Sequence, residues 1–558
     1  MPLTIANYYT YSELARTERP TIEEFRADLA KFRRNEVVYL CSVINCALQN
    51  WHGKTDREAQ DQLIRESLSS QLADYVLAGM HDGENPRGLY HRQQLLLVCK
   101  EAIRVCGEKG LNPLELPFWG GLGLVLLKAN DLLYKKLTHG HGADQILNVI
   151  SEMIPVAEAS GFHNPANKIV RSYAMLSRFL DSRDLDLPKI FESATAIPLR
   201  SFQALSYATH LKYFEFSRES YRSDPTSFLL NADWFRQITL PRRMVESFLA
   251  NTSGDAVQLL DCEEQRDRGV VDFSCFRNLP LFRDGDVFFV LDVAFLAEKA
   301  ETGPFWRVLN ALSTPREKNL AHVLWGAAFE KYINWLIAES VDQKYNLHFP
   351  NPRFVGTLEE VCDAIILCGE CAIFIEAKGS TFTADSKYGT DLVQLQAEIE
   401  DKLVKKKGVG QLASKIERVF SRKSPEAVDG VDLSHITKVF PVLVTRDDIG
   451  SALAMNMYLA LRFKDVFSSK SVSKIVTPLF SLSAQDIEKI CGYLKDASLA
   501  DLLEARYKND PVLKSSFWLV ANPVIERIGS RQCGAFTEIL REFGKMVESE
   551  LFKKPESS

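Results

Sequence analysis

The segment at residues 361–380, VCDAIILCGECAIFIEAKGS, constrains the fold of this chain more than any other stretch. Two apolar runs flank the pair Gly369-Glu370, and glycine in the first position of a two-residue loop favours a type II′ hairpin turn. Such a turn places Cys368 opposite Cys371. We therefore predict two antiparallel strands whose register is set by the turn.

The same register places Asp363 opposite Glu376 at the open end of the hairpin. Side chains alternate along a strand, so Glu376 and Lys378 share a face while Ala377 points away. Opposed carboxylates repel each other, and a divalent cation such as Mg²⁺, which prefers hard oxygen ligands, removes the repulsion. A neighbouring lysine is suited to orient or deprotonate a water, or to stabilise charge on a phosphate. These residues predict metal-dependent phosphodiester hydrolysis.

An alternative interpretation of the same residues is an exposed strand face with a surface ion pair, which is a common arrangement. Two features favour the metal site. Glu376 and Lys378 close the apolar run AIFI, and the hairpin register aligns Asp363 without adjustment. The order of the surrounding elements is a third. We predict a helix at 319–340, strands at 345–350, 361–368 and 371–378, a helical stretch at about 390–420 and a buried strand at 438–447.

This order of elements, with D on the second strand and E-x-K on the third, resembles the catalytic core of the PD-(D/E)XK nuclease superfamily. The resemblance implies an αβββαβ, restriction-endonuclease-like core at about 320–445. Asp363 takes the Asp position of the family motif, and Glu376 and Lys378 take the E-x-K positions.

Two further matches lie on the predicted helices. WGAAFEKYI resembles the first-helix motif, with Glu330 as the matching carboxylate, and KGVGQLASKI resembles the motif of the later helix, with Gln411 as the match. The chain departs from the Q-x-x-x-Y version of that motif, because Lys415 stands at the tyrosine position.

The resemblance implies a Mg²⁺-dependent endonuclease, in which Mn²⁺ is able to substitute and Glu330, Asp363 and Glu376 bind the metal. It favours DNA over RNA as substrate, and prokaryotic restriction or anti-phage defence as context. The rival interpretation is a non-catalytic nucleic-acid-binding or scaffold protein on a degenerate nuclease fold. The complete set of Glu330, Asp363, Glu376 and Lys378 argues against that rival.

Basic residues concentrate just after the predicted hairpin, although the whole chain has a net charge of −6. Within residues 402–423 only Glu417 is acidic. Such a run is usually a solvated helix face, but beside a phosphodiesterase site it predicts a surface that binds the nucleic-acid backbone. The predicted contacts are Lys402, Lys405, Lys406, Lys407, Lys415 and Arg418.

The rest of the chain predicts a multi-domain α+β protein. Helical periodicity fills residues 1–250, which we expect to regulate, to recognise substrate or to bind a second copy or another protein. Residues 251–319 predict a small β-containing connector, with a hairpin turn at Asp284-Gly285 and a break in secondary structure at Gly303 and Pro304. Residues 446–558 predict a helical C-terminal extension.

Cysteine usage and hydropathy indicate the compartment. The chain has 11 cysteines, an odd number set mostly among apolar residues, which is typical of free thiols in a reducing environment. The first residues lack the basic and apolar regions of a signal peptide, and no window carries 18 consecutive apolar residues. We therefore expect a cytoplasmic protein with no membrane partner.

Overall fold

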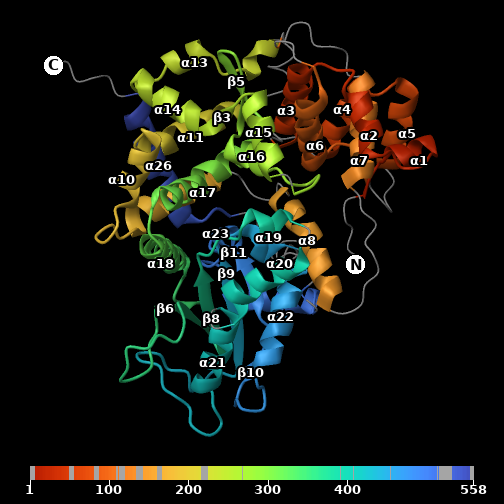
Figure 1. Ribbon diagram of the computed structural model, residues 1–558. Helices are drawn as coiled ribbons and strands as arrows, with labels where there is room; N and C mark the ends of the chain where they lie inside the picture. The colour runs from red at the N-terminus through yellow and green to blue at the C-terminus, as the bar shows by residue number, and fades with distance from the viewer. Residues whose placement is uncertain are drawn as a thin grey trace, which may run out of the picture.

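The structure is a computed structural model of mixed α and β composition (Figure 1). Helices fill the part of the molecule drawn at the top, and the largest sheet lies below them. The residues that it describes are 7–49, 56–80, 87–107, 111, 120–133, 143–159, 166–214, 224–266, 268–389, 391–405, 408–452, 454–511, 513 and 531–552.

The first third of the chain is helical, as its periodicity predicts. A capping box between Thr21 and Glu24 starts α2, which confirms the start signal in the sequence. Helix α3 packs along α6, and two short strands of this region, β1 and β2, pair in parallel. The elements are β1 (Asn7–Tyr8), α1 (Tyr11–Ala15), α2 (Ile22–Leu29), α3 (Arg34–Gln49), α4 (Asp56–Ser67), α5 (Ser70–Met80), β2 (Arg87–Gly88), α6 (Arg92–Val105) and α7 (Gly120–Leu133).

The next helices approach the large sheet. Helix α8 descends beside the sheet region in Figure 1 and packs against α19 and α20. The elements are α8 (Ala143–Ala159), α9 (Ala166–Ala174), η2 (Met175–Phe179), α10 (Leu187–Thr195), α11 (Leu199–Phe214), η3 (Pro225–Phe228), α13 (Ala232–Arg236) and α14 (Arg242–Thr252).

The expected connector at 251–319 contains more helix than its composition predicts. The hairpin is confirmed, because β4 and β5 pair with Asp284 opposite Val287. Gly303 and Pro304, however, do not interrupt the chain: both are buried inside α17, which packs against α9, α10 and α11. Tertiary packing therefore outweighs the cost of proline. The elements are β3 (Ser253–Gly254), α15 (Ala256–Arg266), α16 (Ser274–Asn278), β4 (Leu281–Asp284), β5 (Val287–Val290) and α17 (Val293–Ala311).

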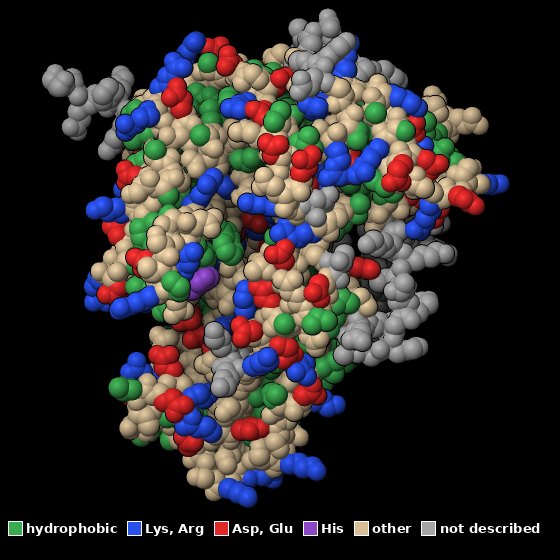
Figure 2. All heavy atoms as spheres, in the orientation of Figure 1, with side chains coloured by type: hydrophobic (Ala, Val, Ile, Leu, Met, Phe, Trp, Pro, Cys, Tyr) green, Lys and Arg blue, Asp and Glu red, His purple; other side chains and the backbone are tan. Residues whose placement is uncertain are grey.

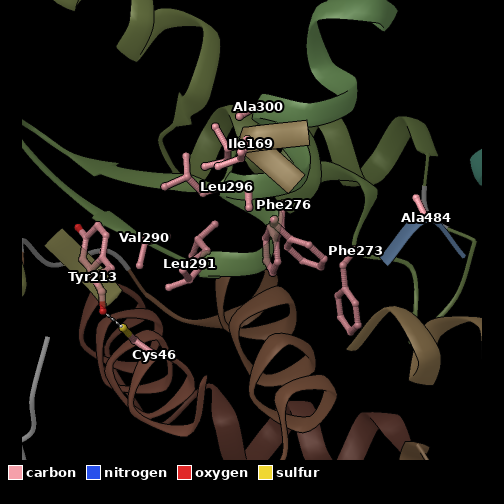
Figure 3. Close-up of a cluster of buried hydrophobic side chains, with 14 of the residues drawn as sticks. Cys46, Ile169, Tyr213, Phe273, Phe276, Val290, Leu291, Leu296, Ala300 and Ala484 are labelled. Atoms are coloured by element: carbon pink, nitrogen blue, oxygen red, sulfur yellow. Dashed lines mark hydrogen bonds between the residues drawn. The ribbon is translucent and has the colours of Figure 1, made fainter. Parts of the chain in front are cut away.

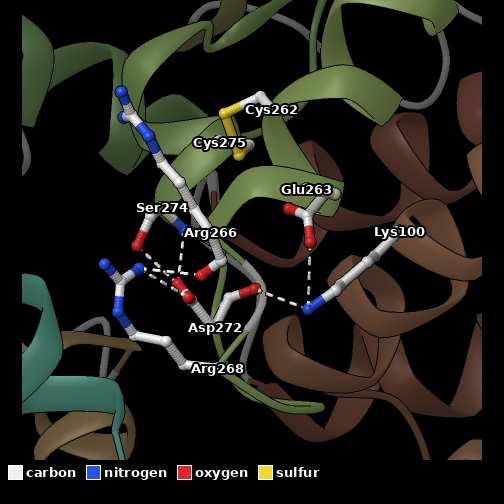
Figure 4. Close-up of a disulfide and its surroundings, with 8 residues drawn as sticks. All are labelled: Lys100, Cys262, Glu263, Arg266, Arg268, Asp272, Ser274 and Cys275. Carbon is white, nitrogen blue, oxygen red and sulfur yellow. Dashed lines mark hydrogen bonds and ion pairs between the residues drawn. A yellow bond between two sulfur atoms is a disulfide. The ribbon is translucent and has the colours of Figure 1, made fainter.

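One disulfide corrects the expectation of free thiols at two of the cysteines. Cys262 on α15 and Cys275 on α16 are joined, with 5.9 Å between their Cα atoms (Figure 4). The buried Lys100 ammonium holds the same loop by donating to the carbonyl oxygens of Gly269 and Asp272. Packing of α15 on α16 brings the two sulfurs together, and nothing in their spacing reveals it. The other cysteines among the described residues are free.

The large sheet has six strands in the order β10-β9-β8-β7-β6, and β11 also pairs with β9. Strands β6, β7 and β8 are antiparallel neighbours, whereas β9 runs parallel to β8. The predicted order of helix, three strands, helix and strand is present. The elements are α18 (Pro315–Ser340), β6 (Leu347–Pro350), β7 (Ala364–Cys368), β8 (Cys371–Lys378), α19 (Ala384–Tyr388), α20 (Leu392–Ile399), η4 (Glu400–Val404), α21 (Val409–Val419) and β9 (Lys438–Thr445).

The segment after residue 445 is not purely helical, because it contributes two strands to this sheet. Its long helix α26 returns to pack on α11. The elements are η5 (Asp448–Ser451), α22 (Met455–Val466), β10 (Ile475–Val476), β11 (Phe480–Ser483), α23 (Ala484–Ile490), α24 (Leu499–Asn509) and α26 (Gly534–Leu551). The expected division into four domains stays a prediction.

A separate apolar core covers each face of the sheet. Ile373, Ile375 and Ala377 of β8 join a cluster that continues into the helical region and the β4–β5 hairpin, part of which is drawn in Figure 3. The alternate residues Ala372 and Phe374 join a second cluster with α8, α20 and α21. Because the first cluster crosses the expected boundaries, the helical region and the sheet bury apolar surface together.

A buried polar network also joins the helical region to the sheet region. The Arg171 guanidinium on α9 donates to Glu301 of α17 at 2.8 Å and to Glu488 of α23 at 2.6 Å. The hydroxyl of Tyr332 on α18 donates to the same oxygen of Glu488 at 2.7 Å. Helix α18 is therefore anchored through Tyr332 to a charged network that spans both regions.

Helix α18 meets the end of β8 through two glycines. A Cβ at Gly379 would lie 2.9 Å from the Cα of Gly326 and 3.3 Å from the Cβ of Phe329. A Cβ at Gly326 would meet no atom within 4 Å. The close approach therefore depends on the absence of a side chain at Gly379 alone.

These contacts predict opposite results for two alanine substitutions. Gly379→Ala should destabilise the protein by about 1–3 kcal/mol, because the added methyl pushes α18 away from the sheet. Gly326→Ala should leave stability unchanged or raise it by up to about 1 kcal/mol, because alanine favours helix. Chemical denaturation of both variants measures this, and equal losses would contradict it.

Candidate active site

The hairpin has the predicted register. Cys368 pairs with Cys371, and the ladder continues without a bulge to Ala364 and Ile375. Gly369 has φ of +56°, the left-handed conformation that the first position of a type II′ turn requires. The turn is therefore the local cause of the register of both strands.

Asp363 lies one residue before β7, beside the end of β8. Its Oδ2 atom accepts a hydrogen bond of 2.6 Å from the backbone N–H of Ala377. This bond fixes the carboxylate between Glu376 and Lys378, on the face of the sheet that carries the second core. Asp363 is 8 % exposed, and burial is the main cause of its raised pKa.

Glu376 is the most deeply buried carboxylate of the group, with 1 % of its surface exposed. Its Oε1 atom accepts a hydrogen bond from the Lys378 ammonium, whereas its Oε2 atom is buried without a partner. Burial raises the pKa of Glu376 to about 8, and the charges of Asp363 and Glu330 add to the shift. One oxygen of this site therefore lacks the contact that its burial demands.

Glu330 joins the group from α18, where it is half-buried. Burial and the charge of Asp363 raise the pKa of Glu330 to about 7. Burial alone would lower the pKa of Lys378, but Glu376 and Asp363 together raise it above its ordinary value. The structure thus brings together Glu330, Asp363, Glu376 and Lys378, four residues that the sequence singles out.

Two polar residues behind the carboxylates hold Asp363 in place. The Asn334 amide donates to the backbone oxygen of Asp363 at 3.0 Å, and its Oδ1 lies 3.1 Å from Nε2 of His348. Asn334 is two turns beyond Gly326 on α18, a spacing visible in the sequence. His348, on the edge strand β6, has no sequence signal that connects it to this site. Glu360, also missed, adds negative charge beside Glu330 and Asp363.

A divalent cation fits the chemistry of these residues. Among the described residues no three His, Cys, Asp or Glu side chains already stand in a metal-binding arrangement. The orphaned Oε2 of Glu376 and the mutual repulsion of Glu330, Asp363 and Glu376 are nevertheless what an added cation would relieve. The residues that would hold it are those three carboxylates.

The other predicted residues lie on or near α21. Gln411 is half-buried in the first turn of that helix, and no described hydrogen bond joins its amide to the carboxylates. Lys406 and Lys407 lie outside the described residues. Lys405 is exposed at the end of η4. The predicted roles of these residues in catalysis and nucleic-acid binding stay predictions.

Three of the four predicted basic residues that the structure describes are paired with nearby acids. Lys415 and Arg418 both form ion pairs with Glu359, and Arg418 also pairs with Glu426. Lys402 pairs with Glu398. On the face drawn in Figure 2, acidic and basic side chains are interspersed. The segment's positive charge therefore partly holds the loop before β7 against α21.

No family model matches this chain, and neither the curated proteins nor the solved structures contain a match. Within the described ranges, no helix has both the length and the apolar character needed to cross a membrane.

The raised pKa of Glu376 predicts how stability changes with pH when no divalent cation is present. The folded protein keeps a proton on Glu376 up to about pH 8, whereas the unfolded chain releases it near the ordinary value of 4.5. Stability should therefore fall as pH rises from 4.5 to 8.

Glu376→Gln should remove much of this fall and stabilise the protein by roughly 1–3 kcal/mol at pH 8. Thermal melts in EDTA across this pH range test the prediction, with Glu339→Gln, an exposed carboxylate of α18, as the control. Parallel pH profiles of the Glu376 variant and wild type would contradict it.

Proposed function

We propose that this protein is a metal-dependent nuclease that hydrolyses phosphodiester bonds. The observation that carries the proposal is the convergence of Asp363, Glu376 and Lys378 at one end of the hairpin, with Glu330 facing them from α18. Burying carboxylates together is costly for a fold. Such an arrangement persists where a cation and a phosphate complete it.

Glu330, Asp363 and Glu376 would hold a divalent cation, Mg²⁺ or Mn²⁺, which supplies positive charge at the scissile phosphate and makes a bound water more acidic. Lys378 keeps its proton, because its pKa is raised by Glu376 and Asp363 after burial has opposed them. Its ammonium therefore donates hydrogen bonds to the attacking water or to a phosphate oxygen. Asn334 and the N–H of Ala377 keep Asp363 in position.

The resemblance of these motifs to the PD-(D/E)XK superfamily supports nucleic acid as substrate, with DNA favoured over RNA. On this proposal the αβββαβ elements form a restriction-endonuclease-like core and the helical N-terminal region recognises the substrate or a protein partner. Lys402 and Lys405 contribute to backbone binding. The proposal also places the protein in the cytoplasm of a prokaryote, with a role in restriction or anti-phage defence.

Substitutions in the cluster should abolish cleavage without unfolding the protein. We expect Asp363→Asn and Glu376→Gln to stop cleavage, and Lys378→Met to slow it by roughly 10²–10⁴. Purified protein is incubated with plasmid, linear DNA and RNA in Mg²⁺ or EDTA, and melting temperature and oligonucleotide affinity are measured beside cleavage. Glu339→Gln is the matched control. Wild-type rates in all three variants would place the active site elsewhere.

Metal binding has a readout that does not depend on activity. Mg²⁺ should raise the melting temperature of the wild type at pH 8. At a concentration 100 times the dissociation constant, its binding adds about 2.7 kcal/mol to the free energy of unfolding. The same addition should have little effect on Asp363→Asn or Glu376→Gln, because each removes a ligand charge. An equal rise in wild type and both variants would refute a cation at these carboxylates.

A further inference from the structure

Arg446 is a buried arginine whose guanidinium has few hydrogen bonds among the described residues. It follows β9 directly and is 3 % exposed. Its Nε atom lies 3.4 Å from the backbone oxygen of Gly379, a weak contact, and its NH1 atom is buried with no hydrogen-bond partner. The charges of Glu301 and of the neighbouring Asp447 and Asp448 attract the guanidinium, but among the described residues none of these carboxylates forms an ion pair with it. By contrast, the equally buried Arg171 pairs with Glu301 and Glu488.

The aromatic neighbour of Arg446 has an orphaned donor of its own. The guanidinium lies over the ring of Trp325, 5.2 Å from its centroid. Trp325 is 2 % exposed, and its indole Nε1 is buried without a hydrogen-bond partner. A buried indole N–H normally finds an acceptor. Two buried side chains, each with a donor atom that lacks an acceptor, therefore lie next to each other.

This pair lies at the same end of the sheet as the proposed active site, with Trp325 in the core on the α18 side. The backbone N–H of Arg446 donates to the carbonyl oxygen of Lys378 at 3.0 Å, because β9 pairs with β8 in parallel. Trp325 precedes Gly326, the residue of α18 that touches Gly379, and Glu330 follows one turn later. Arg446 is therefore hydrogen-bonded to the strand that carries Lys378, and Trp325 lies on the helix that carries Glu330.

Two more basic groups flank the pair. His322, exposed on α18 one turn before Gly326, feels the charges of Lys402 and Arg446, which lower its pKa further after burial has done so. Lys402 donates to the carbonyl oxygen of Thr381 at 2.5 Å, just beyond Lys378 and Gly379. Basic groups therefore extend from the buried Arg446 towards the surface, although the ammonium of Lys402 also pairs with Glu398.

We propose that Arg446 and Trp325 form an anion site, with His322 and Lys402 at its rim, that binds a phosphate of the substrate backbone next to the cleaved bond. The assignment of that phosphate to a nucleic acid rests on the proposed nuclease function. A phosphate oxygen accepts hydrogen bonds and carries negative charge, so one ligand supplies the acceptors that both donors lack and a direct ion pair for the guanidinium. The site would fix the backbone along Gly379–Thr381, leading away from Lys378.

The first test uses inorganic phosphate and does not require nuclease activity. Phosphate should raise the melting temperature of the wild type more than chloride at equal ionic strength does, because it binds only the folded state. This difference should vanish in Arg446→Met and shrink in Trp325→Phe, which keeps the ring and deletes the N–H. Equal differences in wild type and both variants would overturn the site.

Stability without phosphate separates a ligand group from a structural one. Burial lowers the pKa of Arg446 although Glu301, Asp447 and Asp448 attract its charge, so the cation does not stabilise the fold and Arg446→Met should melt at or above the wild-type temperature. Arg171→Met is the matched control and should melt well below it, since it leaves Glu301 and Glu488 buried without their partner. A loss in Arg446→Met as large as that in Arg171→Met would show a structural guanidinium and overturn the proposal.

The last test concerns the nucleic acid. A short DNA oligonucleotide in EDTA should bind Arg446→Met and Lys402→Ala about tenfold or more weakly than wild type, with a flatter dependence on salt. Lys189→Ala, which changes an exposed lysine of α10, is the control. If phosphate stabilises the wild type but no nucleic acid binds or is cleaved, the anion site stands and the nuclease fails. If the wild type cleaves and both variants bind like it, the anion site fails and the nuclease stands.

Discussion

The two-residue turn at Gly369 is the constraint on which the rest of this site depends. It sets β7 against β8, and that register brings Asp363 to the N–H of Ala377. Parallel pairing of β9 with β8 then carries the alignment one strand further and places Arg446 beside Lys378 and Gly379. A shift of one residue would turn every side chain of the shifted strand to the opposite face. It would move Glu376 into the core that contacts α18.

Several buried polar groups near the strand ends that this register aligns lack hydrogen-bond partners, which lowers the stability of the fold. Glu376 has an unpaired buried oxygen on one side of the strand end, and Arg446 and Trp325 have unpaired buried donors near the other. Unsatisfied groups of this kind each cost about 1–3 kcal/mol in a folded protein. The fold offsets the cost through the two apolar cores on the faces of the sheet and through the Arg171 network behind α18. Such a distribution is typical of a protein that gives up stability at its functional site.

The parts that the sequence predicts are those that local rules determine. A glycine at the first turn position predicts the hairpin and the pairing of Cys368 with Cys371, and alternation predicts that Glu376 and Lys378 share a face. Helical spacing likewise predicts α18 with Glu330 on it. The mixed α+β class follows from the same periodicities. Each of these depends on residues close together in the chain.

The parts that the sequence does not predict depend on residues far apart in the chain. Glu359 neutralises Lys415 and Arg418 from more than 50 positions away, so a run of basic residues gives a poor measure of free positive charge. Pro304 lies inside a helix because neighbouring helices bury it. The contact of Arg446 with Trp325 spans the first helix and the fourth strand of the expected core, and only the assembled sheet brings them together.

The positions of these groups around α18 explain why one ligand would satisfy them all. Carboxylates gather near Glu330, where a cation is needed, and unpaired donors gather near Trp325, where an anion is needed. A phosphodiester with its bound cation carries both charges at a short separation. Gly326 lies between the two groups, and the contact with Gly379 fixes the end of β8 against it. The same backbone contact that aligns Lys378 with Glu330 therefore also sets the distance between the proposed cation site and the proposed anion site.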